Sequence, residues 1–275
     1  MALRINTNVA SINAQRNLNK STSALNKSLE RLSSGLRINR AADDAAGLAI
    51  SESMKSDIRA LDQATRNAAD GISMVQLAEG AMDEVSGILI RMRELAQQAG
   101  NETMGVDERG FINAEFSALR TEITRLSDAT EFNGIKLLDG SGATSDILVG
   151  TQATDIIAVD LTNNADTSVA GLNLDASALD TSANAILAMT TINDAVGTLS
   201  GWRADFGVTQ NRLESAMRSI ANTIENLSAA NSRIRDVDIA AETSRMTSSQ
   251  ILQQAGVSVL AQANLSPQMA LSLLQ

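Results

Sequence analysis

The sequence predicts a mainly α-helical protein in which both ends of the chain build a long coiled-coil rod and the middle forms a small β-hairpin region. Two stretches of heptad-spaced aliphatic residues, one toward each end of the 275 residues, are the main reason. Between them, short apolar runs separated by an Asn-Gly pair and by polar turns are typical of hairpins. Aromatic residues make up only 2% of the chain, so burial must come from many small aliphatic contacts, which suits helices packed side by side.

The first heptad stretch covers residues 18–36, where apolar residues recur in steps of four and three. A period of about 3.5 residues keeps one narrow stripe facing a partner helix, so this stripe predicts a coiled-coil seam. Its members are Leu18, Leu25, Leu29 and Leu32.

A second stretch with the same spacing covers residues 213–234 and predicts another seam. Asn231 falls on this stripe, and a single polar residue in a coiled-coil seam is a documented way of fixing register. We therefore interpret Asn231 as a register-setting residue. The apolar members of the seam are Leu213, Met217, Ile220, Ile224, Leu227 and Ile234.

The region between the two seams contains two further predicted helices. A looser apolar stripe from Met74 to Ala99 predicts a helix of about 30 residues, roughly 45 Å long. A break at residues 100–105, which contains Gly and Asn, separates it from a shorter helix at Phe111–Leu126.

Two hairpins are predicted next. Residues 131–137 contain Asn133-Gly134, a pair that suits a type I′ turn because both of its central positions need a positive φ. Residues 147–149 and 156–161 form a second pair of short apolar runs. Residues 162–184 are rich in Asn, Asp, Thr, Ser and Ala and predict a surface loop, and helical spacing resumes near Ala185.

Charge is distributed unevenly along the chain. Residues 1–40 carry seven Lys or Arg side chains against one Glu, whereas residues 137–202 carry eight Asp and no other charged residue. In the last forty residues, apolar side chains spread around most of the helix circumference, and no charge follows Arg245. A helix that is apolar on more than one face must be buried by partners, so both ends of the chain are expected to be incomplete alone.

The residue types that are missing exclude several kinds of chemistry. The chain has no His and no Cys, which rules out a Ser-His-Asp triad, a thiolate nucleophile and the usual His/Cys zinc sites. We therefore expect no enzyme and no cofactor. The net charge of −10 argues against non-specific nucleic-acid binding, because such binding depends on neutralising phosphates.

Two acidic motifs favour turns over binding or catalytic sites. Asp43 and Asp44 are adjacent, and neighbouring helical residues point about 100° apart, so they favour a solvated turn or a polar contact between subunits over a catalytic pair. Residues 139–146 contain two Asp but neither the ligand order nor the closing Glu of a calcium loop.

Targeting segments are not expected. The first residues alternate apolar side chains with Asn and Arg and contain no secretory apolar region. No run of 18 uncharged apolar residues occurs, so we expect no membrane span and no cleaved signal peptide.

Long segments toward both ends of the chain resemble bacterial flagellin. Toward the amino end these are residues 5–36, Arg37–Ile50, Asn67–Ser73 and Arg91–Gln97. Toward the carboxyl end they are Ser232–Thr243, Gln250–Gly256 and Leu271–Gln275. The similar regions together span residues 1–160 and 190–275, and the segments are long enough to be specific.

The resemblance implies a layered arrangement. In flagellins the two chain ends pair as a coiled coil that lines the filament core and are disordered in the monomer, while the adjoining segments form a helical rod. In this chain the filament-core helices would be residues 1–45 and 236–275, the rod residues 46–160 and 186–235, and a short surface loop at 161–185 would replace the outer domains. The polymerisation core would include Ile5, Val9, Ile12, Ile251, Leu252, Val259 and Leu260.

The function that this resemblance implies is that of a structural subunit that polymerises into the flagellar filament. Its partners would be other copies of the chain, an export chaperone, the filament cap and the hook-junction proteins, with type III export to an extracellular filament; a periplasmic filament stays open. Two alternatives are a hook–filament junction protein of the same superfamily and a cytoplasmic coiled-coil adaptor.

The resemblance also implies recognition by the vertebrate Toll-like receptor five. Arg91 and Leu95 match the family's contacting face and are four residues apart, so they are neighbours on a helix. Glu115 on the following helix matches a third contact. The alternative is that Leu95 belongs to the core of the rod and Arg91 is a solvated charge.

Overall fold

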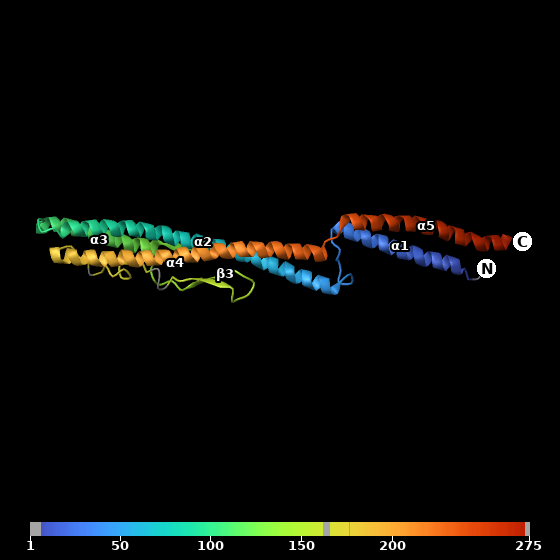
Figure 1. Cartoon of the computed structure of the whole chain (residues 1–275), viewed down its shortest axis with the longest axis horizontal. Helices are drawn as coiled ribbons and strands as arrows, with labels where there is room; N and C mark the ends of the chain where they lie inside the picture. The colour runs from blue at the N-terminus through green and yellow to red at the C-terminus, as the bar shows by residue number, and fades with distance from the viewer. Residues whose placement is uncertain (1–6, 162–165, 176, 273–275) are drawn as a thin grey trace. The chain divides into compact units, whose positions relative to one another are not determined.

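The computed structural model describes residues 7–161, 166–175 and 177–272, and helices dominate this part of the chain (Figure 1). The mainly α fold with a small hairpin region is thereby confirmed. In chain order the elements are α1 Val9–Ser34, α2 Ala45–Ala99, α3 Val106–Ala129, β1 Glu131–Phe132, β2 Ile135–Lys136, β3 Ser145–Leu148, β4 Ile156–Val159, α4 Ser182–Arg235 and α5 Ile239–Ser272.

The chain divides into two compact units. Residues 1–56 and 226–275 form one, here called the terminal unit, and residues 57–225 form the other, here called the central unit. Each unit is therefore described by itself. No helix in the described residues is both long enough and apolar enough to cross a lipid bilayer.

In the terminal unit, α1 and α5 lie side by side (Figure 1). Helix α1 ends at Gly35, whose φ of 72° is the left-handed conformation that glycine adopts easily at the end of a helix. The segments that follow α1 and α4 then pair briefly. The Arg37 amide donates to the Arg235 carbonyl (2.6 Å), and the Val237 amide donates to the Gly35 carbonyl (3.0 Å). Backbone hydrogen bonds therefore fasten the two connections to each other.

The core of the central unit is a continuous aliphatic seam along α2, α3 and α4. The two fully enclosed aromatic rings among the described residues, Phe116 and Phe206, belong to it. Helix α2 is 55 residues long, so the expectation of about 30 residues was too short. Its amino half buries small side chains such as Ala64 and Ala68, which give a weaker hydrophobic period than the Met, Val and Leu residues further along.

Both predicted hairpins are present. The β1–β2 pair turns through Asn133 (φ 51°) and Gly134 (φ 80°), the two positive values that an Asn-Gly turn of type I′ requires. The β3–β4 pair is antiparallel and places Ile147 opposite Ile157. Gly71 of α2 lets this hairpin approach closely, since a Cβ there would lie 3.2 Å from the Ile147 side chain.

The described residues after β4 differ from the surface loop that was expected. They form no helix or strand before α4, but they bury the side chains of Val169, Leu172, Leu174 and Leu179. Buried Thr167 donates its hydroxyl to the Leu138 carbonyl at 3.2 Å. Although most residues of this segment are polar, these four aliphatic side chains are enough to pack the segment onto the core of the central unit. Residues 162–165 and 176 of the expected loop lie outside the described residues.

Candidate functional site

The two terminal helices form an antiparallel pair whose contact follows only part of the predicted α1 seam. Leu25 is buried, and Leu18 and Leu32 are half-buried. Leu29, in contrast, is 47% exposed, and Ser28 takes the buried position beside it. The seam prediction is therefore wrong at Leu29. A helix has about 3.6 residues per turn, so Ser28, three residues after Leu25, still faces α5. Leu29, four residues after Leu25, is turned away from it.

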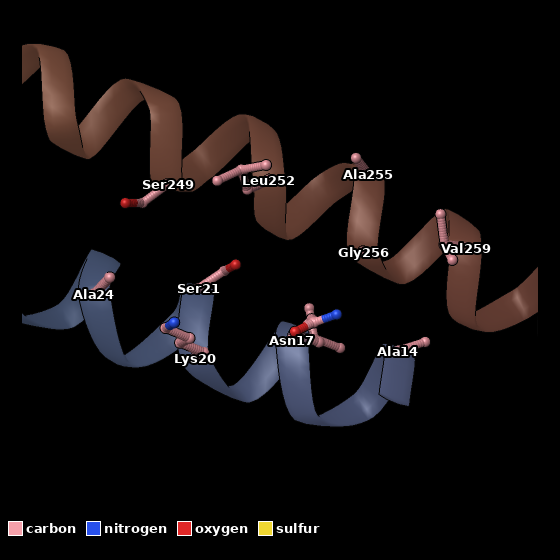
Figure 2. A pocket seen from close by; sticks show the side chains of 11 residues that line it. Ala14, Asn17, Lys20, Ser21, Ala24, Ser249, Leu252, Ala255, Gly256 and Val259 are labelled. Carbon is pink, nitrogen blue, oxygen red and sulfur yellow. The ribbon is translucent and has the colours of Figure 1, made fainter. Parts of the chain in front are cut away.

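A groove of about 540 Å³ runs between α1 and α5 (Figure 2). Mostly small side chains line it, which keeps the two backbones close. At Gly256 a Cβ would lie only 3.3 Å from Leu18 Cδ1, so this position favours glycine. The labelled lining residues are Ala14, Asn17, Lys20, Ser21, Ala24, Ser249, Leu252, Ala255, Gly256 and Val259.

A buried carboxylate joins the two helices near the start of α5. Glu242 is 2% exposed and accepts a hydrogen bond from the Ser28 hydroxyl at 2.6 Å. Its other oxygen lies 3.7 Å from the Arg31 guanidinium and 3.2 Å from that of Arg245. Burial opposes ionisation of Glu242, but the Ser28 hydrogen bond and the two arginines outweigh it and hold the pKa of the carboxyl below its usual value. Glu242 is therefore an ionised link between α1 and α5.

A second polar link lies at the amino end of α1. The Asn8 side chain accepts a hydrogen bond from the Ser11 amide and so caps the helix. The same side chain donates to the Ala263 carbonyl of α5 at 2.8 Å, and Ser11 donates its hydroxyl to Asn264 at 2.9 Å. The helix pair is thus linked at both ends of its contact.

The terminal helices leave exposed most of the apolar residues that the flagellin resemblance assigned to a polymerisation core. Val9, Ile12, Ile251, Leu252 and Val259 are between 49% and 61% exposed. Leu260 is half-buried, and Ile5 lies outside the described residues. Burying the exposed members would be favourable at about 25 cal/mol per Å². This surface can therefore bind apolar partners on the helix faces that α1 and α5 do not cover for each other.

The predicted α4 seam is buried to different degrees. Leu213 and Ile220 are buried, and Leu213 packs with Ala68 and Ile157 in the central unit. The other members, Met217, Ile224, Leu227 and Ile234, are half-buried. The buried side-chain oxygen of Asn231 has no hydrogen-bond partner among the described residues. The register-setting role of Asn231 stays a prediction.

The three residues assigned to receptor recognition are not equivalent. Arg91 and Glu115 are exposed and form an ion pair at 2.9 Å between α2 and α3, and Arg91 also contacts Glu94. These carboxylates raise the pKa of Arg91 through the Glu94 hydrogen bond first and then the Glu115 hydrogen bond. Leu95 is only 2% exposed and packs in the core, so its placement on a contacting face is wrong. The period of α2 turns Leu95 inward with Met92 and Ala99.

The first acidic motif lies in a turn, and the second runs from an irregular segment into β3, which contains Asp146. Asp43 binds Lys27 at 2.6 Å, and this hydrogen bond is the main reason that the pKa of Asp43 is lowered. Asp44 accepts a hydrogen bond from the Gly47 amide at the start of α2. In residues 139–146, Asp139 accepts hydrogen bonds from Ser141. Across the described ranges, no group of three or more carboxylates is placed to hold a metal ion.

Three functional residues of the helix pair were missed from the sequence. Glu242 could have been noticed as the single acidic residue after Asp238 in an otherwise almost uncharged segment. Asn8 and Gly256 carry no comparable pattern, because their roles depend on which residue of the partner helix lies opposite.

The chain matches two family models. The bacterial flagellin N-terminal helical region matches residues 5–143, and the bacterial flagellin C-terminal helical region matches residues 189–274. Flagellin of Halalkalibacterium halodurans is 48% identical over 271 residues, which are 98% of this chain and 99% of that protein. Flagellin of Bacillus subtilis is 43% identical over 99% of this chain and its own full length. The crystal structure of Bacillus cereus flagellin is similar at a TM-score of 0.52 and 27% identity, covering 60% of this chain and 94% of that one.

Proposed function

This chain belongs to the bacterial flagellin family, and from that membership we propose that α1 and α5 are the surface through which its copies pack in the filament. The chain is a structural subunit of the bacterial flagellar filament. The hook–filament junction and adaptor alternatives are not favoured, since flagellins match it over nearly its whole length. The observation that supports the proposal is the row of exposed apolar side chains on the terminal helices.

The proposal divides the chain into an assembling part and a rod. Residues 1–45 and 236–275 would form the inner layer of the filament, and residues 46–160 and 186–235 the surrounding rod. In support, the central unit has a core of its own, and the terminal helices leave Ile251 and Leu252 exposed. Only neighbouring copies supply enough apolar surface to cover such side chains along a whole filament.

Deleting residues 1–40 and 240–275 tests this division. We expect a soluble, helical monomer that melts cooperatively and does not polymerise, because the core of the central unit is retained. Filaments formed by the truncated chain would contradict the proposal.

A matched pair of point variants gives a finer test. Ile251 is 61% exposed, so Ile251→Asn should leave the monomer folded but raise the concentration of free subunit in equilibrium with filament about tenfold. Ile251→Leu keeps the apolar area and should change this concentration little. Equal effects of the two substitutions would show that apolar burial at this position does not drive assembly.

We further propose that the exposed Arg91–Glu115 ion pair contributes to recognition by Toll-like receptor five. Arg91→Ala should weaken receptor binding by monomer by about 2 kcal/mol if it is an interface hot spot. Arg125→Ala is a matched control, because Arg125 forms a similarly exposed ion pair with Glu122 on α3. Unchanged binding of the Arg91 variant, or no binding by the parent monomer, would remove this proposal.

Family membership also supports partners in export and assembly. We propose an export chaperone, the filament cap and the hook-junction proteins as partners, with an extracellular filament as the destination. Mass spectrometry of filaments sheared from intact cells tests the destination. Recovery of the chain only after the outer envelope is opened would place it in a periplasmic filament instead.

A further inference from the structure

The last turns of α5 contain a proline, and this has a direct consequence for one backbone carbonyl. Pro267 lies inside α5 and has no backbone N–H group. In a helix the N–H of each residue bonds the carbonyl four residues earlier, so position 267 cannot serve Ala263. The Ala263 carbonyl therefore needs a donor from outside the normal helical pattern.

Asn8 supplies that donor from the other terminal helix. Its side-chain Nδ2 lies 2.8 Å from the Ala263 oxygen, although the two residues are 255 positions apart. The Asn8 side-chain oxygen at the same time accepts from the Ser11 amide at 3.1 Å. Because a carbonyl needs a donor and an amide N–H needs an acceptor, only this orientation of the carboxamide satisfies both groups.

We infer that Asn8 sets the register of α1 against α5 by bonding the carbonyl that Pro267 leaves free. The other carbonyls along the body of a regular helix are occupied by their own helix, so a donor on α1 finds one distinctive acceptor on α5. A slide of α5 by one turn would carry this acceptor about 6 Å away from Asn8. The bond from Ser11 to the adjacent residue Asn264 strengthens the same alignment.

This inference rests on the proposed role of α1 and α5 in assembly. The register decides which exposed residues of the two helices stand next to each other. Copies of the chain can pack regularly only when every copy presents the same combined surface. Asn8 is thus a positioning residue for polymerisation.

The first experiment uses full-length chains carrying Asn8→Ser, Pro267→Ala or both. Serine keeps the helix cap but is too short to reach Ala263, so Asn8→Ser should raise the free subunit concentration at equilibrium with filament by about three- to tenfold. Pro267→Ala restores the missing N–H, so in that background Asn8→Ser should change the concentration less than about twofold. Asn13→Ser, at an exposed asparagine of α1, is the control and should have little effect.

A second experiment reads the register directly. A Cβ at position 256 would lie 3.7 Å from the Leu18 Cβ, which is the spacing of a disulfide, and the chain has no native Cys. Oxidation of the pair Leu18→Cys and Gly256→Cys in filaments therefore reports the native alignment. The pair Leu18→Cys and Leu260→Cys reports a slide by one helical turn. Asn8→Ser should lower the disulfide yield of the 18–256 pair and raise that of the 18–260 pair, each about twofold. Adding Pro267→Ala should reverse both changes.

The outcomes separate this inference from the proposed function. If Asn8→Ser leaves the two disulfide yields unchanged, or shifts them equally with and without Pro267→Ala, Asn8 does not act through the carbonyl freed by Pro267 and the inference fails. If the disulfide yields shift as expected while neither Asn8→Ser nor Ile251→Asn alters polymerisation, the register role stands and the proposed assembly surface fails.

Discussion

Replacing Glu242 by Ala removes the carboxylate that links α1 to α5 near the start of α5. The substitution deletes the acceptor for the buried Ser28 hydroxyl and leaves the guanidinium of Arg31, a side chain that is 18% exposed, without its carboxylate partner. Glu242→Gln is the milder change, because its amide oxygen still accepts from Ser28 while the charge is lost. The two variants together separate the hydrogen bond from the ion pairs.

The structure sets the expected size of the effect. A hydrogen bond to a charged group contributes about 1.5–3 kcal/mol, and breaking a buried ion pair costs about 3–5 kcal/mol. The Arg245 contact adds little, since that side chain is 68% exposed. We expect Glu242→Ala to destabilise the helix pair by about 3 kcal/mol and Glu242→Gln by about 1–2 kcal/mol.

The assay is the concentration of free subunit in equilibrium with filament, because the proposed assembly surface consists of the ordered helix pair. About 3 kcal/mol corresponds to a rise of roughly a hundredfold for Glu242→Ala. Glu30→Ala is the matched control, because the Glu30–Arg40 pair is 40% and 72% exposed and should change the concentration about twofold at most. Equal values for the Glu242→Ala and Glu30→Ala chains would refute the importance of burial at this link.

Three further predictions concern both units of the chain. Because folding lowers the pKa of Glu242, its stabilisation is fully present above the unfolded-state pKa of about 4.3 and is lost as pH falls through the lower folded value. The extent of filament disassembly should therefore depend less steeply on pH for Glu242→Gln than for the parent chain. Identical pH profiles of the two chains would contradict this. Gly71→Leu should destabilise the monomer by about 1–3 kcal/mol and so lower its melting temperature, since a Cβ at position 71 would already lie 3.3 Å from the Leu213 side chain. Gly80→Leu should not, because a Cβ at position 80 would have no atom within 4 Å. Leu213→Ala should destabilise the central unit by about 2–5 kcal/mol and the exposed Arg212→Ala by less than about 0.5 kcal/mol, measured by thermal unfolding followed by circular dichroism.

Local patterns predicted the elements of this fold well. The Asn133-Gly134 turn was predicted because its chemistry depends on two adjacent residues alone. The helices were predicted because their core faces repeat with the helical period. Helix α2 was underestimated because alanines such as Ala64 carry little hydrophobic contrast even where they are buried.

The functional surface was predicted only in part, and the reason is physical. The need of the terminal helices for partners was expected from their apolar pattern, since a helix that is apolar on several faces must be covered, whereas the particular residues came from the flagellin resemblance. Leu95 was misplaced because being four residues from Arg91 does not decide which side of α2 faces the core. Glu242 and Asn8 bond residues that are 214 and 255 positions away in the sequence. A pattern of neighbouring residues cannot predict which residue of the partner helix lies opposite them.

The brief pairing after α1 and α4 includes two bonds that do not depend on which side chains are present. Its amide-to-carbonyl bonds, from Arg37 to Arg235 and from Val237 to Gly35, are made by groups that most amino acids share. Side-chain changes at these positions therefore keep the two backbone bonds, although the Arg37 side chain also donates to the Ile234 carbonyl at 3.1 Å and Arg235 pairs with Glu52. Two kinds of change would still break the backbone bonds: proline at 37 or 237, which has no N–H to donate, and a β-branched residue at 35, where φ is 72°. A library of variants at residues 35, 36 and 237 should accordingly lose motility mainly through these two kinds of change, whereas the same diversity at Ser28 and Glu242 should rarely be tolerated.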